Sequence, residues 1–167
     1  MRLLVATGLL ITAALIQSLI GPDLPLIRSR PDFPLVIVLA WSMLRGSSEG
    51  AFAGFVGGLL LDTVGYTPFG INAALLGLLG YVAGLPEANV YRGNLPFFLL
   101  TAALATVVYH TGVFVLLQAR GLAMPPILQM YSGALRAAML NALLVAPTFV
   151  LCRRLLRMMA GFTQLRL

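Results

Sequence analysis

The chain has 167 residues, of which 60% are hydrophobic and 10% are charged, and its formal net charge is +6. A water-soluble domain carries about 25% charged residues, so a chain this poor in charge, with a mean hydropathy of +0.97, is expected to fold in lipid. Most arginines stand singly at the ends of apolar runs, as do the basic residues that orient helices in a membrane. This arrangement argues against a nucleic-acid-binding face.

Six apolar runs are expected to form membrane helices. They cover residues 3–20, 31–44, 49–64, 70–85, 95–118 and 127–152. The first resembles a signal peptide, but no small-residue cleavage site closes it and five runs follow, so we interpret it as a membrane helix. The predicted architecture is an all-α, multi-pass membrane bundle formed by residues 1–152, followed by a basic tail, 153–167.

The second to fourth runs are shorter than the about 20 residues that a helix needs to cross a bilayer. We expect them to complete the crossing with polar ends, or to lie beside longer helices where the bilayer is thinner. A re-entrant segment is the alternative.

The arginines predict the orientation of the bundle, because cytoplasmic loops carry an excess of positive charge. With a cytoplasmic N-terminus, seven arginines lie inside and three outside. The inner set is Arg2, Arg45, Arg92, Arg153, Arg154, Arg157 and Arg166, and the outer set is Arg28, Arg30 and Arg120. Both termini are therefore predicted to be cytoplasmic.

The segment "RSRPDFP" (28–34) opens the second run. Ser29 is expected to cap the helix, with Asp32 reaching back as the partner in a capping box. Pro31 is tolerated in the first turn, where its missing N–H costs nothing. Arg28 and Arg30 stay available for phosphates or for a partner.

A stripe of glycines at every fourth position marks the third run. Its members are Gly46, Gly50, Gly54 and Gly58. In lipid, small residues at this spacing allow helix backbones to approach closely. We favour packing within the same subunit, against a small-residue face of the fourth run (Ala73, Gly77, Gly80, Gly84); docking of a partner's helix is the alternative.

Asp62 lies four residues after Gly58, at the next position of the glycine stripe, and precedes a turn that contains Gly65, Pro68 and Gly70. A carboxylate near a helix C-terminus opposes the helix dipole. Asp62 is therefore expected to pair with the N–H groups that open the fourth helix, around Gly70 to Asn72. Contact with an ion or a substrate is the alternative.

Three polar residues lie inside the later runs: His110, Arg136 and Asn141. His110 is expected to hydrogen-bond between helices, and since it is the only histidine, a His-rich metal site is excluded. Arg136 is expected to snorkel outward or to pair with Asp32 or Asp62. A contact between Asn141 and His110 is a weaker hypothesis.

Features that carry chemistry are scarce, and no cofactor is implied. The single cysteine, Cys152, excludes an internal disulfide framework and a cysteine-rich metal site. Paired catalytic carboxylates and a phosphate-binding loop are missing from the sequence, which argues against an enzyme. In the tail, Arg153, Arg154 and Arg157 alternate with apolar residues, which predicts an interfacial helix on anionic lipid. A cytoplasmic partner is the alternative.

Two segments resemble the MreD family of rod-shape proteins: "RPDFPLVIVLAW" and "GSSEGAFAGFVGGLLLDTVGYTPFGINAALLGLLGYVAG". The family pattern has an Arg-Pro-Asp opening, matched by Arg30, Pro31 and Asp32. A glycine-rich span ending in Leu-Leu-Asp is matched at Gly54, Gly58, Leu61 and Asp62, and the following turn at Pro68 and Gly70. Phe69 stands where the family usually has leucine, and the resemblance covers residues 30–85.

The resemblance implies a non-enzymatic scaffold of the cell-elongation machinery, located in the inner membrane of a bacterium. Such a protein would bind MreC and, through it, MreB, the RodA glycosyltransferase and a class B penicillin-binding transpeptidase. The family has also been compared with the substrate-binding subunits of energy-coupling-factor vitamin transporters. A transport subunit is therefore the rival hypothesis, with a pocket formed by Tyr66, Phe69, Asn72 and Arg136. Pairing of two copies is left open by the sequence.

Overall fold

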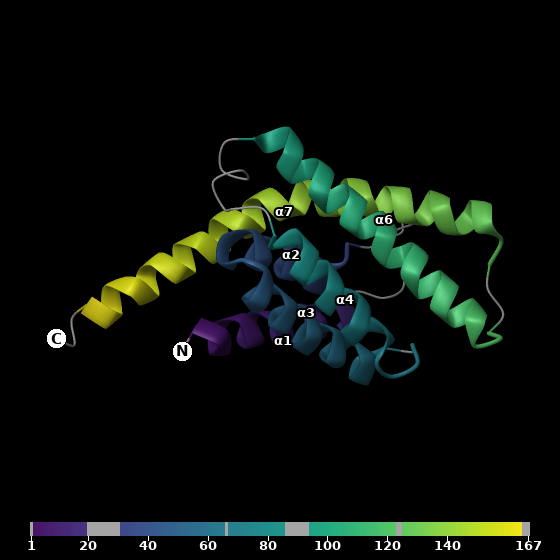
Figure 1. Ribbon diagram of the computed structural model, residues 1–167, viewed down its shortest axis with the longest axis horizontal. Helices are drawn as coiled ribbons and strands as arrows, with labels where there is room; N and C mark the ends of the chain where they lie inside the picture. Colours follow the sequence, from purple (N-terminus) through teal and green to yellow (C-terminus); the bar gives the residue numbers. More distant parts are fainter. Residues whose placement is uncertain (1, 20–30, 66, 86–93, 123–124, 165–167) are drawn as a thin grey trace.

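The computed structural model describes residues 2–19, 31–65, 67–85, 94–122 and 125–164. These residues contain α-helices and no β-strand, as the sequence predicts. The helices are α1 (Arg2–Leu19), α2 (Phe33–Arg45), α3 (Ser47–Val64), α4 (Ile71–Ala83), α6 (Leu95–Ala119) and α7 (Ile127–Gln164) (Figure 1).

The short helix α2 lies at the centre of the bundle, where it contacts α1, α3, α4, α6 and α7. Leu39, Ala40 and Trp41 have no exposed surface, and a helix that is apolar on all sides is expected to be enclosed by protein. Its 13 residues would extend about 20 Å, less than the about 30 Å of a bilayer's hydrocarbon core. Because other helices surround α2, bilayer thickness does not set its length.

Helices α3 and α4 form a tightly packed antiparallel pair on one side of α2 (Figure 1). One residue, Gly46, separates α2 from α3, and its φ of 91° lies in the region that favours glycine. Gly70, with a φ of 97°, stands directly before α4. A glycine with a positive φ therefore stands directly before α3 and another directly before α4.

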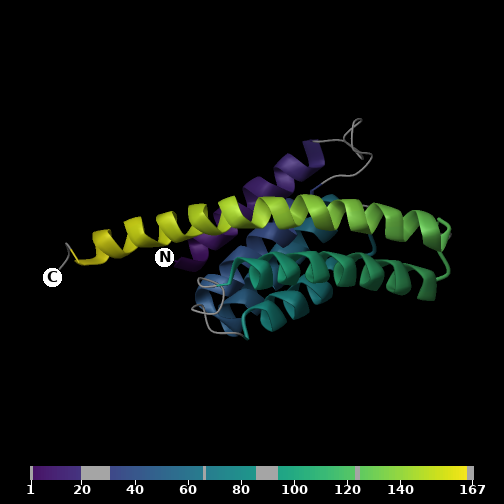
Figure 2. The same cartoon turned by 90° about the horizontal axis from the view of Figure 1, so that it is seen from above.

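Helices α6 and α7 form the long hairpin of the bundle and pack against each other (Figure 2). Only Pro96–Ala119 and Ile127–Met158, among the described helices, are long and apolar enough to cross a membrane. The apolar helices Val5–Leu19, Phe33–Arg45 and Ile71–Ala83 are shorter.

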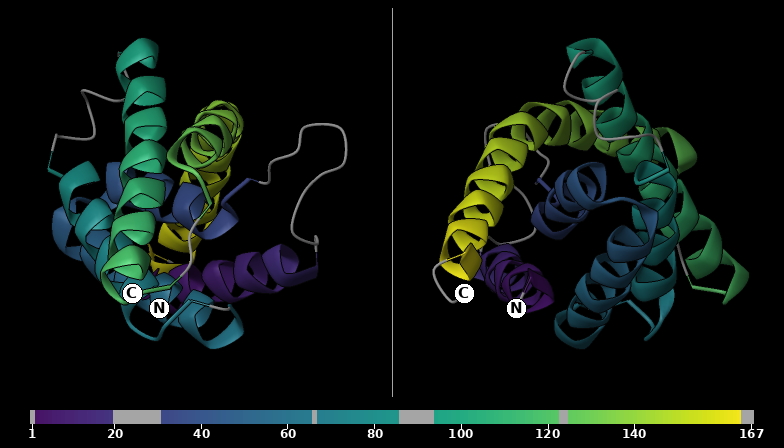
Figure 3. Two further views of the ribbon diagram at one scale, coloured as in Figure 1. Left: turned by 90° about the vertical axis from the view of Figure 1, so that its right-hand side faces the viewer. Right: turned by 60° about the vertical axis from the view of Figure 1, so that its left-hand side comes forward.

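Helix α7 continues through Cys152, where the sequence analysis divides the bundle from the tail, to Gln164. Its 38 residues correspond to about 57 Å, so its C-terminal part projects past the other helices (Figures 1 and 2). Pro147 lies inside the helix, and α7 bends over α2 in the right-hand view of Figure 3. Proline is a recognised cause of such bends because it removes a backbone hydrogen bond.

Candidate functional site: a glycine seam and two buried carboxylates

Three glycines of α3, at positions 50, 54 and 58, lie directly against the backbone of α4, and we call this contact the glycine seam. A Cβ atom on Gly54 would collide with the carbonyl oxygen of Leu76, and one on Gly58 with the backbone of Ala73. A Cβ on Gly50 would collide with the carbonyl oxygen of Gly80. The missing side chains therefore bring two helices of one subunit into backbone contact.

The α4 side of the seam is equally close at its far end. A Cβ on Gly80 would meet the carbonyl oxygen of Gly50, and one on Gly84 would meet the backbone at Gly46 and Ser47. Gly77 is less constrained, since a Cβ there would lie 3.6 Å from the backbone nitrogen of Phe55, an ordinary contact. The predicted small-residue face of the fourth run thus packs on the glycine stripe.

An ion pair closes the end of the seam where α2 meets α3. Arg45 Nη2 lies 2.6 Å from Glu49 Oε1, and Arg45 Nε donates to Glu49 Oε2 at 3.0 Å. The two bonds form the bidentate geometry that arginine favours with a carboxylate. Both side chains are about a quarter exposed, so the pair is expected to add little stability.

Asp62 lies at the opposite end of the seam and is 6% exposed. Its Oδ2 accepts hydrogen bonds from the N–H groups of Gly70 at 2.9 Å and Ala73 at 3.1 Å, and its Oδ1 accepts from Asn72 N–H at 3.1 Å. These are the free N–H groups that open α4, so the pairing predicted for Asp62 is present. The positive end of the α4 dipole offsets the buried negative charge.

The turn after α3 is joined to α6 through Asn72. Its side-chain amide donates to Thr67 Oγ1 at 2.6 Å, and its Oδ1 accepts from Tyr109 O–H at 2.7 Å. Within the same turn, Ile71 N–H donates to the carbonyl of Pro68 at 3.4 Å. The Asp62 end of the seam is therefore tied to α6 as well as to α4.

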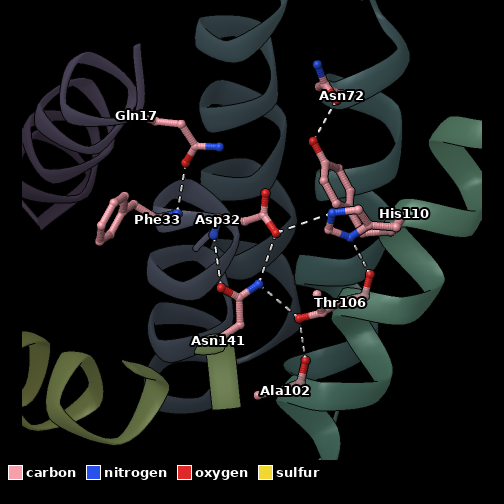
Figure 4. Close-up of polar contacts among 9 residues, drawn as sticks. Gln17, Asp32, Phe33, Asn72, Ala102, Thr106, His110 and Asn141 are labelled. Carbon is pink, nitrogen blue, oxygen red and sulfur yellow. Dashed lines mark hydrogen bonds and ion pairs between the residues drawn. The ribbon is translucent and has the colours of Figure 1, made fainter. Parts of the chain in front are cut away.

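Asp32, the second buried carboxylate, contacts α7 (Figure 4). Its backbone N–H donates to Asn141 Oδ1 at 2.9 Å, and Asn141 Nδ2 donates to Asp32 Oδ2 at 3.1 Å. The next N–H along, that of Phe33, donates to Gln17 Oε1 of α1 at 2.9 Å. Side chains of α1 and α7 thus satisfy the first N–H groups of α2.

The predicted capping role of Asp32 is wrong. Helix α2 begins at Phe33, so Asp32 occupies the position before the helix, and its side chain makes no capping hydrogen bond. The carboxylate is instead held by Asn141, in a buried site where a hydrogen bond is stronger than in water. Pro31 is buried next to it, whereas Arg28, Ser29 and Arg30 lie outside the described residues.

Thr106 and His110 of α6 complete the cluster around Asp32 (Figure 4). Asn141 Nδ2 also donates to Thr106 Oγ1 at 3.1 Å, and the Thr106 hydroxyl donates to the Ala102 carbonyl at 2.8 Å. His110 Nδ1 lies 3.0 Å from the Thr106 carbonyl, which only accepts, so Nδ1 carries the hydrogen. His110 Nε2 faces Asp32 Oδ2 at 3.7 Å and forms an ion pair when the ring is protonated.

The predicted partners of the remaining polar residues are also wrong. Asn141 and His110 do not bond to each other, and each contacts Asp32 and Thr106 instead. Among the described residues, Arg136 forms no ion pair with Asp32 or Asp62, and its Nε is buried without an acceptor. Asp62 is instead engaged by backbone N–H groups at the start of α4, and Asp32 by Asn141.

The candidate lipid and pocket residues are spread over the structure. Arg154 and Arg157 are exposed on the projecting part of α7, and Arg153 is half-buried. Of the residues proposed for a transporter pocket, Phe69 is exposed and Asn72 is engaged by Thr67 and Tyr109. Tyr66 lies outside the described residues.

Sequence reasoning missed four residues that complete these contacts: Gln17, Asn72 as a bridge, Thr106 and Tyr109. Each is a polar residue inside or beside an apolar run. This position could have identified them from the sequence, because a buried polar group in lipid needs a partner. Gln17 accepts from Phe33 N–H, Thr106 accepts from the Asn141 amide, and Tyr109 donates to Asn72. Across the part of the chain that the structure describes, no three His, Cys, Asp or Glu side chains are placed to hold a metal ion.

The arrangement therefore holds helices together: the seam and Asp62 join α3 to α4, and Asp32 joins α2 to α6 and α7. A family model described as rod shape-determining protein MreD matches residues 1–159. Comparisons with curated proteins and with solved structures each gave no match. Since the family model spans nearly the whole chain, including both carboxylates and the glycine seam, this protein belongs to the MreD family.

Proposed function

We propose that this protein is a non-enzymatic membrane scaffold of the bacterial cell-elongation complex, and that it binds MreC directly. Through MreC it would link the MreB cytoskeleton to peptidoglycan synthesis by RodA and a class B penicillin-binding transpeptidase. Membership of the MreD family, over residues 1–159, is the observation that carries the proposal. It implies a role in rod-shape determination, and the family is one of membrane proteins.

The distribution of polar groups supports a scaffold. Asp32, Asp62, Asn72 and Asn141 are buried and hydrogen-bonded to other parts of the same chain. Since these groups already hold the bundle together, a partner would bind by packing on the outward faces of the helices. The glycine seam is filled by α4, so the partner would use another surface.

Two outward faces are available for such packing. One is on the α3–α4 pair and exposes Phe52, Phe55, Leu78 and Val82; the other is on α6 and α7 and exposes Leu104, Val108, Leu135, Met139 and Leu143. In lipid, apolar side chains like these contact either acyl chains or another protein's helix.

The proposed topology has six membrane spans with both termini in the cytoplasm. The excess of arginines on that side supports it, as do the two long apolar helices α6 and α7. Labelling of single cysteines by a membrane-impermeant reagent in intact cells tests it. A cysteine at Gln118, beside the α6–α7 turn, is expected to react from outside and one at Ser48, at the start of α3, only after lysis.

Co-purification tests the scaffold directly. The tagged protein, co-expressed with MreC and extracted in a mild detergent, is expected to retain MreC through size-exclusion chromatography. A folded protein that always elutes without MreC contradicts the proposal. Thermal stabilisation of the MreC-free protein by a vitamin-like solute would favour the transport subunit instead.

A further inference from the structure

Arg136 of α7 has no hydrogen-bond or ion-pair partner among the residues that the structure describes. It is half-buried, its Nε is buried without an acceptor, and no ion pair of Arg136 occurs among the described residues. We propose that Arg136, together with the open surface over Gly133, binds the phosphate of a membrane phospholipid. This inference rests on the proposed topology, in which the α6–α7 turn faces outward.

Among the described residues, the two buried carboxylates, Asp32 and Asp62, do not pair with Arg136. Both oxygens of Asp62 accept N–H groups at the start of α4, and Asp32 is held by Asn141 and faces His110. A guanidinium with one nitrogen buried away from water and without an acceptor is less stable than one that is hydrogen-bonded. The anion must therefore come from outside this part of the chain.

The position of Arg136 along α7 favours a lipid phosphate. The basic cluster begins at Arg153, and a membrane span takes about 20 residues, which places the outer edge of the hydrocarbon near Gly133. Arg136 then lies three residues inside that edge, or about 4.5 Å. Side chains on a helix lean toward its N-terminus, which for α7 is the outer end, so the guanidinium is directed toward the headgroups.

The surface around Arg136 leaves room for a headgroup. A Cβ atom added to Gly133, one turn before Arg136, would meet nothing within 4 Å. Gln129, a further turn outward, is exposed and carries an amide donor, and Tyr131 is exposed at the same level. Tyrosine is enriched where helices pass through the headgroup region, and a guanidinium binds a phosphate through two parallel hydrogen bonds.

Native mass spectrometry of the purified protein tests the site. Arg153, Arg154 and Arg157 are first replaced by glutamine, so that the tail cannot bind the probe. The probe is dioleoyl phosphatidylglycerol, and dioleoylglycerol, which lacks the phosphate, is the matched lipid. The parent is expected to retain the first and not the second. Arg136→Gln is expected to retain about tenfold less phosphatidylglycerol, the loss of one charge-assisted contact.

Arg120→Gln is the matched control, because Arg120 is exposed beside the α6–α7 turn and should retain lipid like the parent. Gly133→Leu keeps the charge but fills the open surface, and it is also expected to lose the lipid. If Arg136→Gln does not fold, lipid retention by Gly133→Leu tests the proposed site. Equal retention by the parent and both variants overturns the proposal.

Unchanged lipid retention in Arg136→Gln, combined with loss of MreC, would also overturn it and assign Arg136 to an acidic residue of a partner helix. Because the lipid measurement uses the protein without MreC, it stands whether or not MreC co-purifies.

Discussion

Asp32 and Asn141 exchange two hydrogen bonds across a sequence separation of 109 residues. Both residues are buried, Asn141 completely, and the contact joins the start of α2 to the middle of α7 (Figure 4). Since α2 is the central helix, this contact fixes its position relative to the long α6–α7 hairpin. Asn141 also reaches Thr106 of α6, so one amide connects three helices.

Asn141→Leu is expected to lower the free energy of unfolding by about 3 kcal/mol, because it leaves a buried carboxylate and a backbone N–H without partners. Reversible unfolding in mixed detergent micelles measures the change. Gln118→Leu, at an exposed position on α6, is the control and is expected to change stability by less than about 0.5 kcal/mol. Equal effects of the two substitutions would show that the Asp32 contact is unimportant.

Gly54→Ala is expected to destabilise the protein by about 1–3 kcal/mol, since a single methyl group would force α3 and α4 apart. Gly8→Ala is the matched control: Gly8 is also helical, and a Cβ there meets nothing within 4 Å. The control is expected to be neutral or to gain up to about 1 kcal/mol from helix propensity. Thermal unfolding of the two variants side by side measures the difference. A Gly54→Ala protein of unchanged stability would contradict the close α3–α4 contact at the glycine seam.

Asp62→Ala is expected to cost about 2 kcal/mol, because three N–H groups at the start of α4 lose their acceptor. Asp62→Asn keeps one oxygen and should cost less. Hydrogen exchange of the Gly70, Asn72 and Ala73 amides gives a local readout, with faster exchange expected in both variants. Unchanged protection of these amides would show that another group caps α4.

The Arg45–Glu49 pair is expected to contribute little. A double-mutant cycle with Arg45→Gln and Glu49→Gln should give a coupling of about 0.2–1 kcal/mol, and added salt should reduce it. Unfolding measured at low and at high ionic strength provides both values. A coupling well above this range, insensitive to salt, would indicate that the pair is shielded from solvent.

The sequence predicted the local parts of this structure well. Proline and glycine bound the second to fourth runs, so the observed helices begin and end close to the expected positions. Asp62 and its acceptor role were predictable because its partners lie within 11 residues. The glycine spacing likewise identified both faces of the seam, since small residues at every fourth position indicate close helix contact.

The long-range contacts could not be predicted in the same way. Asp32 has a plausible local partner in Ser29, and nothing in the sequence reveals that Asn141, far along the chain, bonds to Asp32. Arg136 was expected to find a carboxylate, but backbone N–H groups and Asn141 engage both candidates. The tail after Cys152 was predicted to form an interfacial helix, and α7 continues without a break to Gln164, because arginine and leucine are good helix formers.

Cross-linking to MreC from neighbouring positions tests the scaffold most directly. In a Cys152→Ser background, cysteines are placed at the outward residues Phe52 and Leu135 and at their inward neighbours Ala53 and Ala134. The account predicts that MreC is cross-linked from one or both outward positions and from neither inward neighbour. Cross-links from the inward neighbours in a folded protein, or none from either outward face, would contradict it.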